Sequence, residues 1–207
     1  LPEVMEVAED MIKYVVRAVL EECPAEMDFF ERFVENGLKA KLSNIVESSF
    51  AVLDYTDAIG LLKKADVKFQ FPVEWGCDLQ TEHEKYITEQ VYRKPVFVVN
   101  YPKEIKSFYM KQNADGKTVA ATDLLVPGIG EIIGGSEREA DPDKLLAAMQ
   151  ARGMDLASYE QYLDLRKFGT APHGGFGLGF DRFVMYVTGM ENIPDDVPFP
   201  RTAKNIM

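Results

Sequence analysis

A series of short β-prone segments separated by turn residues constrains the fold of this chain more than any other feature. Pro95-Val-Phe-Val-Val-Asn100 is rich in β-branched residues and predicts a strand. Three further strands are predicted at Ser107–Lys111, Lys117–Val126 and Gly130–Glu139. The turns between them are predicted at Asn113–Gly116 and Pro127–Gly128. Strands joined by such short turns pair antiparallel, because parallel pairing needs a crossover of about a dozen residues or more. The series therefore predicts an antiparallel sheet and not a doubly wound parallel one.

Segments with helical periodicity flank this series. Pro2–Cys23 has acidic residues near its start and apolar residues three or four positions apart. Thr56 and Thr81 are expected to cap two of the other helices. Further helices are predicted at Ala25–Glu35, Leu38–Glu47, Thr56–Lys64, Thr81–Val91 and Ala157–Phe168. One more helix is predicted to begin at Asp141, and another to end near Gly189. Two more strands are predicted at Phe50–Tyr55 and Gly174–Gly179. The pattern predicts an α+β domain, mainly helical over residues 1–94, with the antiparallel sheet and its flanking helices over 95–207.

The composition argues against several classes of protein. With 34 acidic and 23 basic residues the net charge is −11, so this chain by itself is expected to hold a nucleic acid poorly. No apolar run approaches the roughly 20 residues that span a bilayer, and no membrane partner is expected. Cys23 and Cys77 match no metal or redox spacing and are expected to be reduced thiols of a cytoplasmic protein. His83 and His173 have no Cys or His near them in the sequence, which argues against zinc.

Two carboxylates flank the Pro127-Gly128 turn. A two-residue loop would place Asp123 and Glu131 on opposite faces of the hairpin, whereas a three-residue loop, Pro127–Ile129, would place them diagonally on one face, roughly 7–8 Å apart. In the second arrangement they would suit Mg²⁺, which in turn holds a polyphosphate. The alternative is a pair of solvated acids on an ordinary hairpin, and composition alone favours that alternative.

The strand that follows contains two adjacent glycines and an arginine. Glycine weakens a strand and often marks the close approach of a ligand or of another backbone, as expected at Gly134 and Gly135. Arg138 is an even number of positions from Gly134, so it faces the same way in an unbulged strand. A guanidinium suits a planar carboxylate. The alternative is a surface ion pair between Arg138 and Glu137 or Glu139.

A second glycine-rich run extends from His173 to Arg182. Gly175, Gly177 and Gly179 alternate along the predicted strand, which leaves one face as bare backbone open to a flat ligand. Arg182 falls in the first turn of the next helix, where it can stack on a base or reach a phosphate. A dinucleotide-binding loop is the alternative, but the glycine spacing is wrong and no parallel βαβ unit surrounds it.

The segment Trp75–Glu84 is explained by a turn followed by a capped helix start. His83 within it is expected to be structural. The sequence offers no Ser-His-Asp or Cys-His arrangement that would supply a nucleophile.

Together these segments resemble the class II aminoacyl-tRNA synthetases, and within them the asparaginyl enzymes. The resemblance covers essentially the whole chain. Gly128–Glu139 looks like the asparaginyl version of a segment that aspartyl enzymes spell differently, His173–Arg182 looks like class II motif 3, and Pro198–Thr202 resembles the C-terminal tail of the family.

The resemblance implies that ATP and asparagine form asparaginyl-adenylate, from which asparagine passes to tRNA(Asn). ATP and Mg²⁺ are the implied cofactors, with Asp123 and Glu131 holding the metal and the ATP phosphates. Arg138, with Gly134 and Ser136, would bind asparagine. Arg182 would lie over the adenine beside Gly177 and Gly179, and the two arginines would be the catalytic residues. The chemistry needs positioning and charge stabilisation more than acid–base groups.

The chain also departs from the family pattern. Motifs 1 and 2 and the N-terminal anticodon-binding domain are absent, so we expect the C-terminal portion of the catalytic domain, inactive alone, of an enzyme that is a homodimer at full length. Pro194 replaces an arginine in Asn192–Asp195, Asp196 is unexpected, and Asp181 replaces a glutamate before the motif 3 arginine. Two other hypotheses remain: an aspartyl-tRNA synthetase or asparagine-synthesising paralogue, and a non-catalytic binding module derived from a synthetase.

Overall fold

A five-stranded sheet forms the centre of the molecule. The computed structural model describes residues 1–202, and the strands of the sheet lie in chain order. They are β1 (Ala51–Asp54), β2 (Val96–Val99), β3 (Ala121–Val126), β4 (Gly130–Glu137) and β5 (Gly174–Leu178). The pairings of β2 with β3, β3 with β4 and β4 with β5 are antiparallel, as predicted.

The first strand corrects the prediction of a wholly antiparallel sheet. β1 pairs with β2 in parallel, with Ala51 opposite Val96. The 41 residues between them, 55–95, contain helices and are long enough to return the chain to the same edge in the same direction. The sheet is therefore mixed, with its one parallel pair at the edge.

Helices cover both faces of the sheet. One face packs against α1 (Pro2–Glu22), α3 (Leu38–Glu47) and α8 (Phe180–Thr188), and α2 (Pro24–Phe33) adds Met27 to the same cluster of buried side chains. The other packs against α4 (Tyr55–Lys63), α5 (Thr81–Lys85) and the π-helix Tyr86–Val91. The side chains of β3 point alternately to the two faces of the sheet, so this strand contributes to both clusters of buried side chains. Leu124 and Val126 lie in the first cluster, and Ala121 and Leu125 lie in the second.

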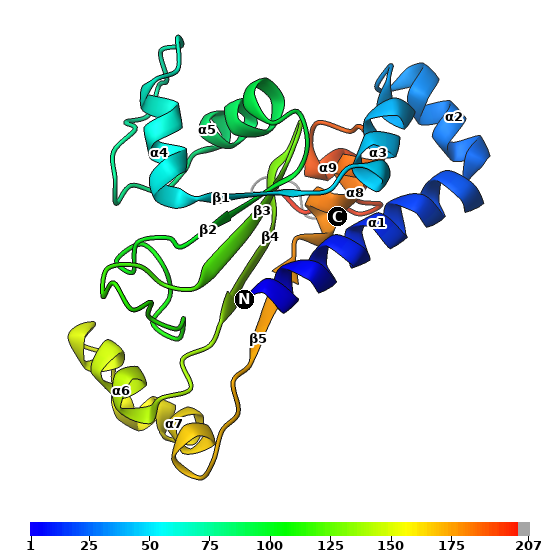
Figure 1. The fold of residues 1–207 in the computed structure, drawn as a ribbon. Coiled ribbons are helices and arrows are strands. Elements are labelled where there is room, and N and C mark those ends of the chain that lie inside the picture. The colour runs from blue at the N-terminus through cyan, green and yellow to red at the C-terminus, as the bar shows by residue number, and fades with distance from the viewer. Residues whose placement is uncertain (203–207) are drawn as a thin grey trace.

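The remaining helices lie at the ends of the sheet. α6 (Pro142–Ala151) and α7 (Glu160–Lys167), with the 3₁₀ turn Leu156–Tyr159 before α7, lie beside each other and apart from the other helices, whereas α9 (Ile193–Asp196) lies next to α8 (Figure 1). Asp141 caps α6 as predicted, accepting hydrogen bonds from the backbone N–H groups of Asp143 and Lys144. Within residues 1–202, no helix combines the length and the apolar character that crossing a membrane requires.

Several predicted local features are wrong. Asp54, and not Thr56, caps α4, and Gln80, and not Thr81, precedes α5. Ser107–Lys111 forms turns and isolated bridges and no strand, and β3 begins at Ala121 instead of Lys117. The backbone of the loop between β2 and β3 bonds largely to other parts of the same loop and to Glu137 and Glu139 at the end of β4. These partners are distant in sequence, so local propensity does not reveal them.

Two apolar residues at the C-terminal end of α2 lie outside the core. Phe33 is 65% exposed and Val34 37%, although Met27 on the same helix is buried. His83, in contrast, is buried, and its Nδ1 accepts the backbone N–H of Gln80 at 3.1 Å, which fits the structural role expected for it.

Candidate active site

The β3–β4 hairpin brings Asp123 and Glu131 together on one face. Val126 pairs with Gly130, so the loop has three residues, and a register shift follows between Leu124 and Leu125. A Cβ built on Gly134 would lie 3.1 Å from Oε1 of Glu131 and 3.5 Å from Oδ1 of Asp123. Both carboxylates therefore converge on the same point above the sheet, and the three-residue alternative is the one that the structure adopts.

The surroundings of the two carboxylates are partly buried and carry both signs of charge. Burial raises the pKa of Glu131 above its ordinary value, and the neighbouring charge of Asp123 raises it further. Lys106 and Arg182 act in the opposite direction. Lys106 pairs directly with Asp123, because its Nζ lies 2.5 Å from Oδ2. The charges of the two neighbouring acids are thus partly balanced by Lys106 and Arg182.

A third carboxylate, Glu84 on α5, lies beneath the hairpin. Its Oε2 accepts the backbone N–H of Glu131 at 3.1 Å. Burial raises its pKa to about 7, with the charges of Glu131 and Asp123 adding to the effect. Glu84 was not predicted as a site residue, since nothing local in the sequence distinguishes it from Glu82, which instead accepts the backbone N–H groups of Gln70 and Phe71.

Arg138 points into the same region from the end of β4. Its guanidinium donates to Oγ of Ser136 and, at 3.4 Å, to the carbonyl oxygen of Gly175, and it lies 4.9 Å from the centroid of the Tyr109 ring. Glu137 pairs instead with Lys111, so that part of the surface ion-pair alternative does not hold. Glu139 likewise accepts backbone N–H groups, those of Gln112 and Asp141.

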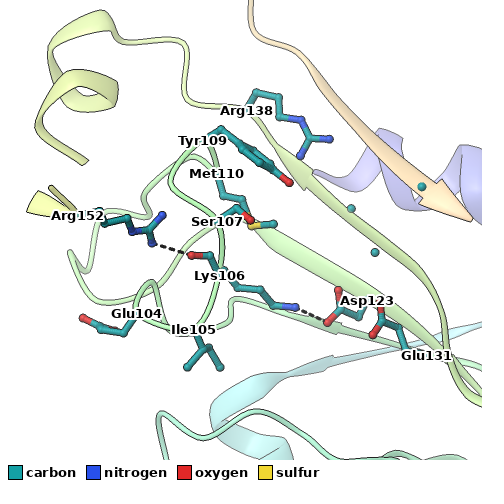
Figure 2. A pocket seen from close by; sticks show the side chains of 13 residues that line it. Glu104, Ile105, Lys106, Ser107, Tyr109, Met110, Asp123, Glu131, Arg138 and Arg152 are labelled. Atoms are coloured by element: carbon teal, nitrogen blue, oxygen red, sulfur yellow. Dashed lines mark hydrogen bonds and ion pairs between the residues drawn. The ribbon is translucent and has the colours of Figure 1, made fainter. Parts of the chain in front are cut away.

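Asp123, Glu131 and Arg138 line a cavity of about 700 Å³ (Figure 2). Its floor is backbone at Gly134, Gly135 and Gly177, and an added Cβ on Gly177 would meet nothing within 4 Å. Its charged lining comprises Glu104, Lys106, Asp123, Glu131, Arg138 and Arg152. Ser136 is fully buried and supports Arg138 from below. The cavity can therefore take a small zwitterion, with anionic and cationic groups at different points of its wall.

Arg182 lies in the first turn of α8, as predicted, but outside this cavity. Its Nη1 donates to the carbonyl oxygen of Glu131 at 2.8 Å, and its side chain packs beside Gly179. It lines a second cavity of about 940 Å³ together with Lys41 and Lys85. Arg138 and Arg182 thus line two separate cavities, and the hydrogen bond from Arg182 to the backbone of Glu131 connects the second cavity to a residue that lines the first.

Lys106, Tyr109 and Arg152 are among the residues that line the first cavity and were not predicted as site residues. Lys106 and Tyr109 come from the loop between β2 and β3, and Arg152 comes from the end of α6. That loop was predicted to contain a strand, which obscured its role. Among residues 1–202, no three His, Cys, Asp or Glu side chains gather closely enough to hold a metal ion by themselves. A cation on Asp123 and Glu131 would therefore take further oxygen ligands from a substrate.

Comparison with known proteins identifies the family. The family model described as tRNA synthetases class II (D, K and N) matches residues 1–203. The asparagine–tRNA ligase of Acetivibrio thermocellus is 58% identical over 203 residues, which are 98% of this chain and 44% of that protein. That of Clostridium novyi is 57% identical over 202 residues, again 98% and 44%. The chain thus spans less than half the length of these curated relatives.

Solved structures agree with these relatives. Asparaginyl-tRNA synthetase from Pyrococcus horikoshii has a TM-score of 0.86 at 41% identity, covering 98% of this chain and 46% of that one. The Entamoeba histolytica enzyme in complex with asparaginyl-adenylate has a TM-score of 0.85 at 28% identity, covering 98% and 45%. The covered share of a relative's length does not show which part of that relative the chain matches. The comparisons therefore do not bear out the expectation that the chain is a C-terminal portion. The chain belongs to the class II tRNA synthetases of the D, K and N group.

Proposed function

We propose that this chain carries the amino-acid and nucleotide pockets of an asparagine–tRNA ligase. The observation that carries the proposal is the cavity in which Asp123, Glu131 and Arg138 converge over a floor of glycine backbone. The identities of 57–58% to proteins named asparagine–tRNA ligase support asparagine as the amino acid. One similar structure, from Pyrococcus horikoshii, holds asparaginyl-adenylate, which implies that ATP is consumed in that enzyme.

Each charged group of the site has a part in this proposal. Arg138, held by Ser136 beside Gly134, binds the carboxylate of asparagine. Arg182 binds ATP from the second cavity, with Gly177 and Gly179 leaving room for the nucleotide. Arg138 places the carboxylate of asparagine and Arg182 holds the adenine of ATP, so these two residues contribute orientation and charge stabilisation.

Asp123 and Glu131 fit Mg²⁺. Their oxygens converge, and Mg²⁺ is commonly held by one or two carboxylates together with the phosphates of a substrate. When bound, the ion would neutralise charge on the polyphosphate. Glu84 then has a supporting part, because its hydrogen bond to the backbone of Glu131 holds one of the two carboxylates in place.

The whole enzyme would pass asparagine to tRNA(Asn), act as a homodimer and work in the cytoplasm. The chain spans 44% of its relatives, so we expect it to show no asparagine-dependent exchange of pyrophosphate into ATP by itself. Exchange by the 207-residue chain would contradict that expectation. The aspartyl-tRNA synthetase of Entamoeba histolytica, at 23% identity and a TM-score of 0.77, shares the fold alone.

Binding of the free amino acid tests the proposal. Asparagine is expected to raise the free energy of unfolding of the chain in urea, by about 2.7 kcal/mol at one hundred times its Kd, because it binds only the folded state. Aspartate at the same concentration is expected to raise it less. A larger effect of aspartate would favour the aspartyl or asparagine-synthesising paralogue. No effect of asparagine, aspartate or ATP would favour a non-catalytic module.

A further inference from the structure

Lys106 is a cation inside the first cavity that the proposed roles leave unused. It projects from the loop between β2 and β3 toward the carboxylates, and its Nζ lies 2.5 Å from Oδ2 of Asp123 (Figure 2). The Lys106 side chain is 16% exposed and the Asp123 side chain 10%. Salt and water therefore screen this pair much less than a surface ion pair.

The backbone that carries Lys106 is held in place from α6. Arg152, which follows the last residue of that helix, donates to the carbonyl oxygens of Lys103 and Lys106 at 2.8 and 2.7 Å. The ring of Tyr101 supports the ammonium, with Nζ 3.9 Å from its centroid. The backbone is thus held at Lys103 and at Lys106, the two ends of a short turn. The four-carbon side chain of Lys106 can still change its rotamer.

The ammonium lies beside the position that a divalent cation bound to Asp123 and Glu131 would take. Asp123 offers one oxygen to Lys106 and directs the other toward the point that it shares with Glu131. A divalent ion on Asp123 and Glu131 would stand a few ångströms from the ammonium, and like charges at that separation repel strongly in a partly buried site. The two cations therefore compete for the same carboxylate.

We propose that Lys106 is a built-in counter-ion that neutralises Asp123 in the ligand-free protein and leaves it when a divalent cation binds. Arg152 is the positioning residue that keeps Lys106 at Asp123. The metal half of this inference rests on the proposed function, whereas the pairing of Lys106 with Asp123 does not. The side chain released by the metal remains at the cavity wall, where it can meet an anionic group of a substrate.

Acetylation by acetic anhydride, read lysine by lysine by mass spectrometry, tests the pairing without any metal. Asp123→Asn and Arg152→Met are both expected to raise the acetylation rate of Lys106 several-fold. Lys103 is the internal control for Asp123→Asn, because it lies in the same loop and donates to the carbonyl oxygen of Gly116 instead. Lys13, which pairs with Glu9 on α1, is the control for Arg152→Met. Adding Mn²⁺ to the wild-type chain should likewise raise the rate at Lys106 alone. An unchanged rate at Lys106 in Asp123→Asn or with Mn²⁺ would overturn the proposal.

Mn²⁺ binding, followed by the loss of the free-ion paramagnetic resonance signal, tests the competition. Lys106→Met keeps the apolar stem and removes the charge, so it is expected to tighten Mn²⁺ binding about ten-fold, whereas Lys103→Met should leave it unchanged. Equal, weaker or undetectable binding in Lys106→Met would overturn the proposal. So would tight binding that persists in Lys106→Met/Asp123→Asn. If asparagine fails to stabilise the chain while Lys106→Met tightens Mn²⁺ binding, the proposed function fails and the counter-ion stands.

Discussion

The carboxylate of Glu84 on α5 accepts the backbone N–H of Glu131 on β4, with 3.1 Å between Oε2 and N. This hydrogen bond joins the helical crossover between β1 and β2 to the hairpin that carries the acidic pair of the cavity. Its two partners lie 47 residues apart in the chain. The geometry of the site therefore depends on a buried acid that itself does not line the first cavity.

Stability should fall with rising pH because of Glu84. Burial, the largest cause, raises its folded-state pKa from 4.5 to about 7, so the folded chain keeps a proton that the unfolded chain releases. The free energy of unfolding should therefore fall between pH 4.5 and pH 7, by on the order of 3 kcal/mol from this group. Urea unfolding of Glu84→Gln across that range should show a shallower fall, with a remainder from Glu131, whose pKa is also raised.

Glu82 is the matched control for this prediction. Backbone N–H groups of Phe71 and Gln70 lower its pKa, so its contribution is present above its unfolded value of 4.5 and is lost as the pH falls. Glu82→Gln should leave the fall between pH 4.5 and pH 7 intact. Equal slopes for the wild-type chain and Glu84→Gln would contradict the raised pKa of Glu84.

A glycine is required at position 130 by the approach of Glu84. Gly130 has a φ of +92°, and a Cβ there would lie 2.3 Å from Oε2 of Glu84. Gly128 in the same loop has a φ of +88°, but its Cβ would meet only Nζ of Lys41, at 4.0 Å. Both alanine variants carry backbone strain, so Gly130→Ala should be the less stable by about 1–3 kcal/mol in urea. In a Glu84→Ala background the difference in the free energy of unfolding between the two alanine variants should shrink. A difference that persists would mean that the added Cβ at position 130 clashes with a group other than Glu84.

Arg138 should govern the affinity for asparagine. Removing one partner of a charge-assisted hydrogen bond costs about 1.5–3 kcal/mol, so Arg138→Ala should weaken asparagine binding about 10- to 100-fold in calorimetry. Lys111→Met is the control, because Lys111 neighbours the same strand but pairs with Glu137 and lies outside the cavity. An unchanged affinity in Arg138→Ala would remove Arg138 from the amino-acid site.

Arg182 should govern the affinity for ATP and leave asparagine largely unaffected. Its guanidinium lines the second cavity and touches the first only through the carbonyl oxygen of Glu131. Arg182→Met is therefore expected to weaken ATP binding about ten-fold, by the loss of one charged contact. Lys167→Met on α7 removes an exposed charge that lines neither cavity and serves as the control. Equal losses for ATP and asparagine in Arg182→Met would mean that the two cavities are not separate sites.

Features set by local pattern could be predicted from the sequence. The even spacing of Gly134 and Arg138 placed both on the cavity, and the alternation of glycines in β5 left Gly177 with open space above it. The turn at Pro127 left two loop lengths open, and only the pairing of Val126 with Gly130 decides between them. Strands β2, β4 and β5 and helix α1 begin and end within about two residues of their predicted ranges.

Features set by distant pairing could not be predicted. The direction of β1 depends on how the crossover 55–95 returns, which its four residues do not encode. Lys106 and Arg152 meet because α6 packs against a loop that has no regular structure, and their hydrogen bonds span 46 residues. Glu84 reaches the hairpin through the same kind of long-range contact.

The affinity of the chain for a non-hydrolysable asparaginyl-adenylate analogue tests the central claim most directly. The analogue carries both the amino-acid and the nucleotide groups, so calorimetry should show one site per chain, with tighter binding than either asparagine or ATP alone and weaker binding in both Arg138→Ala and Arg182→Met. The aspartyl analogue should bind more weakly. Binding of the asparaginyl analogue that is absent, or that neither arginine variant weakens, would contradict the assignment of this site.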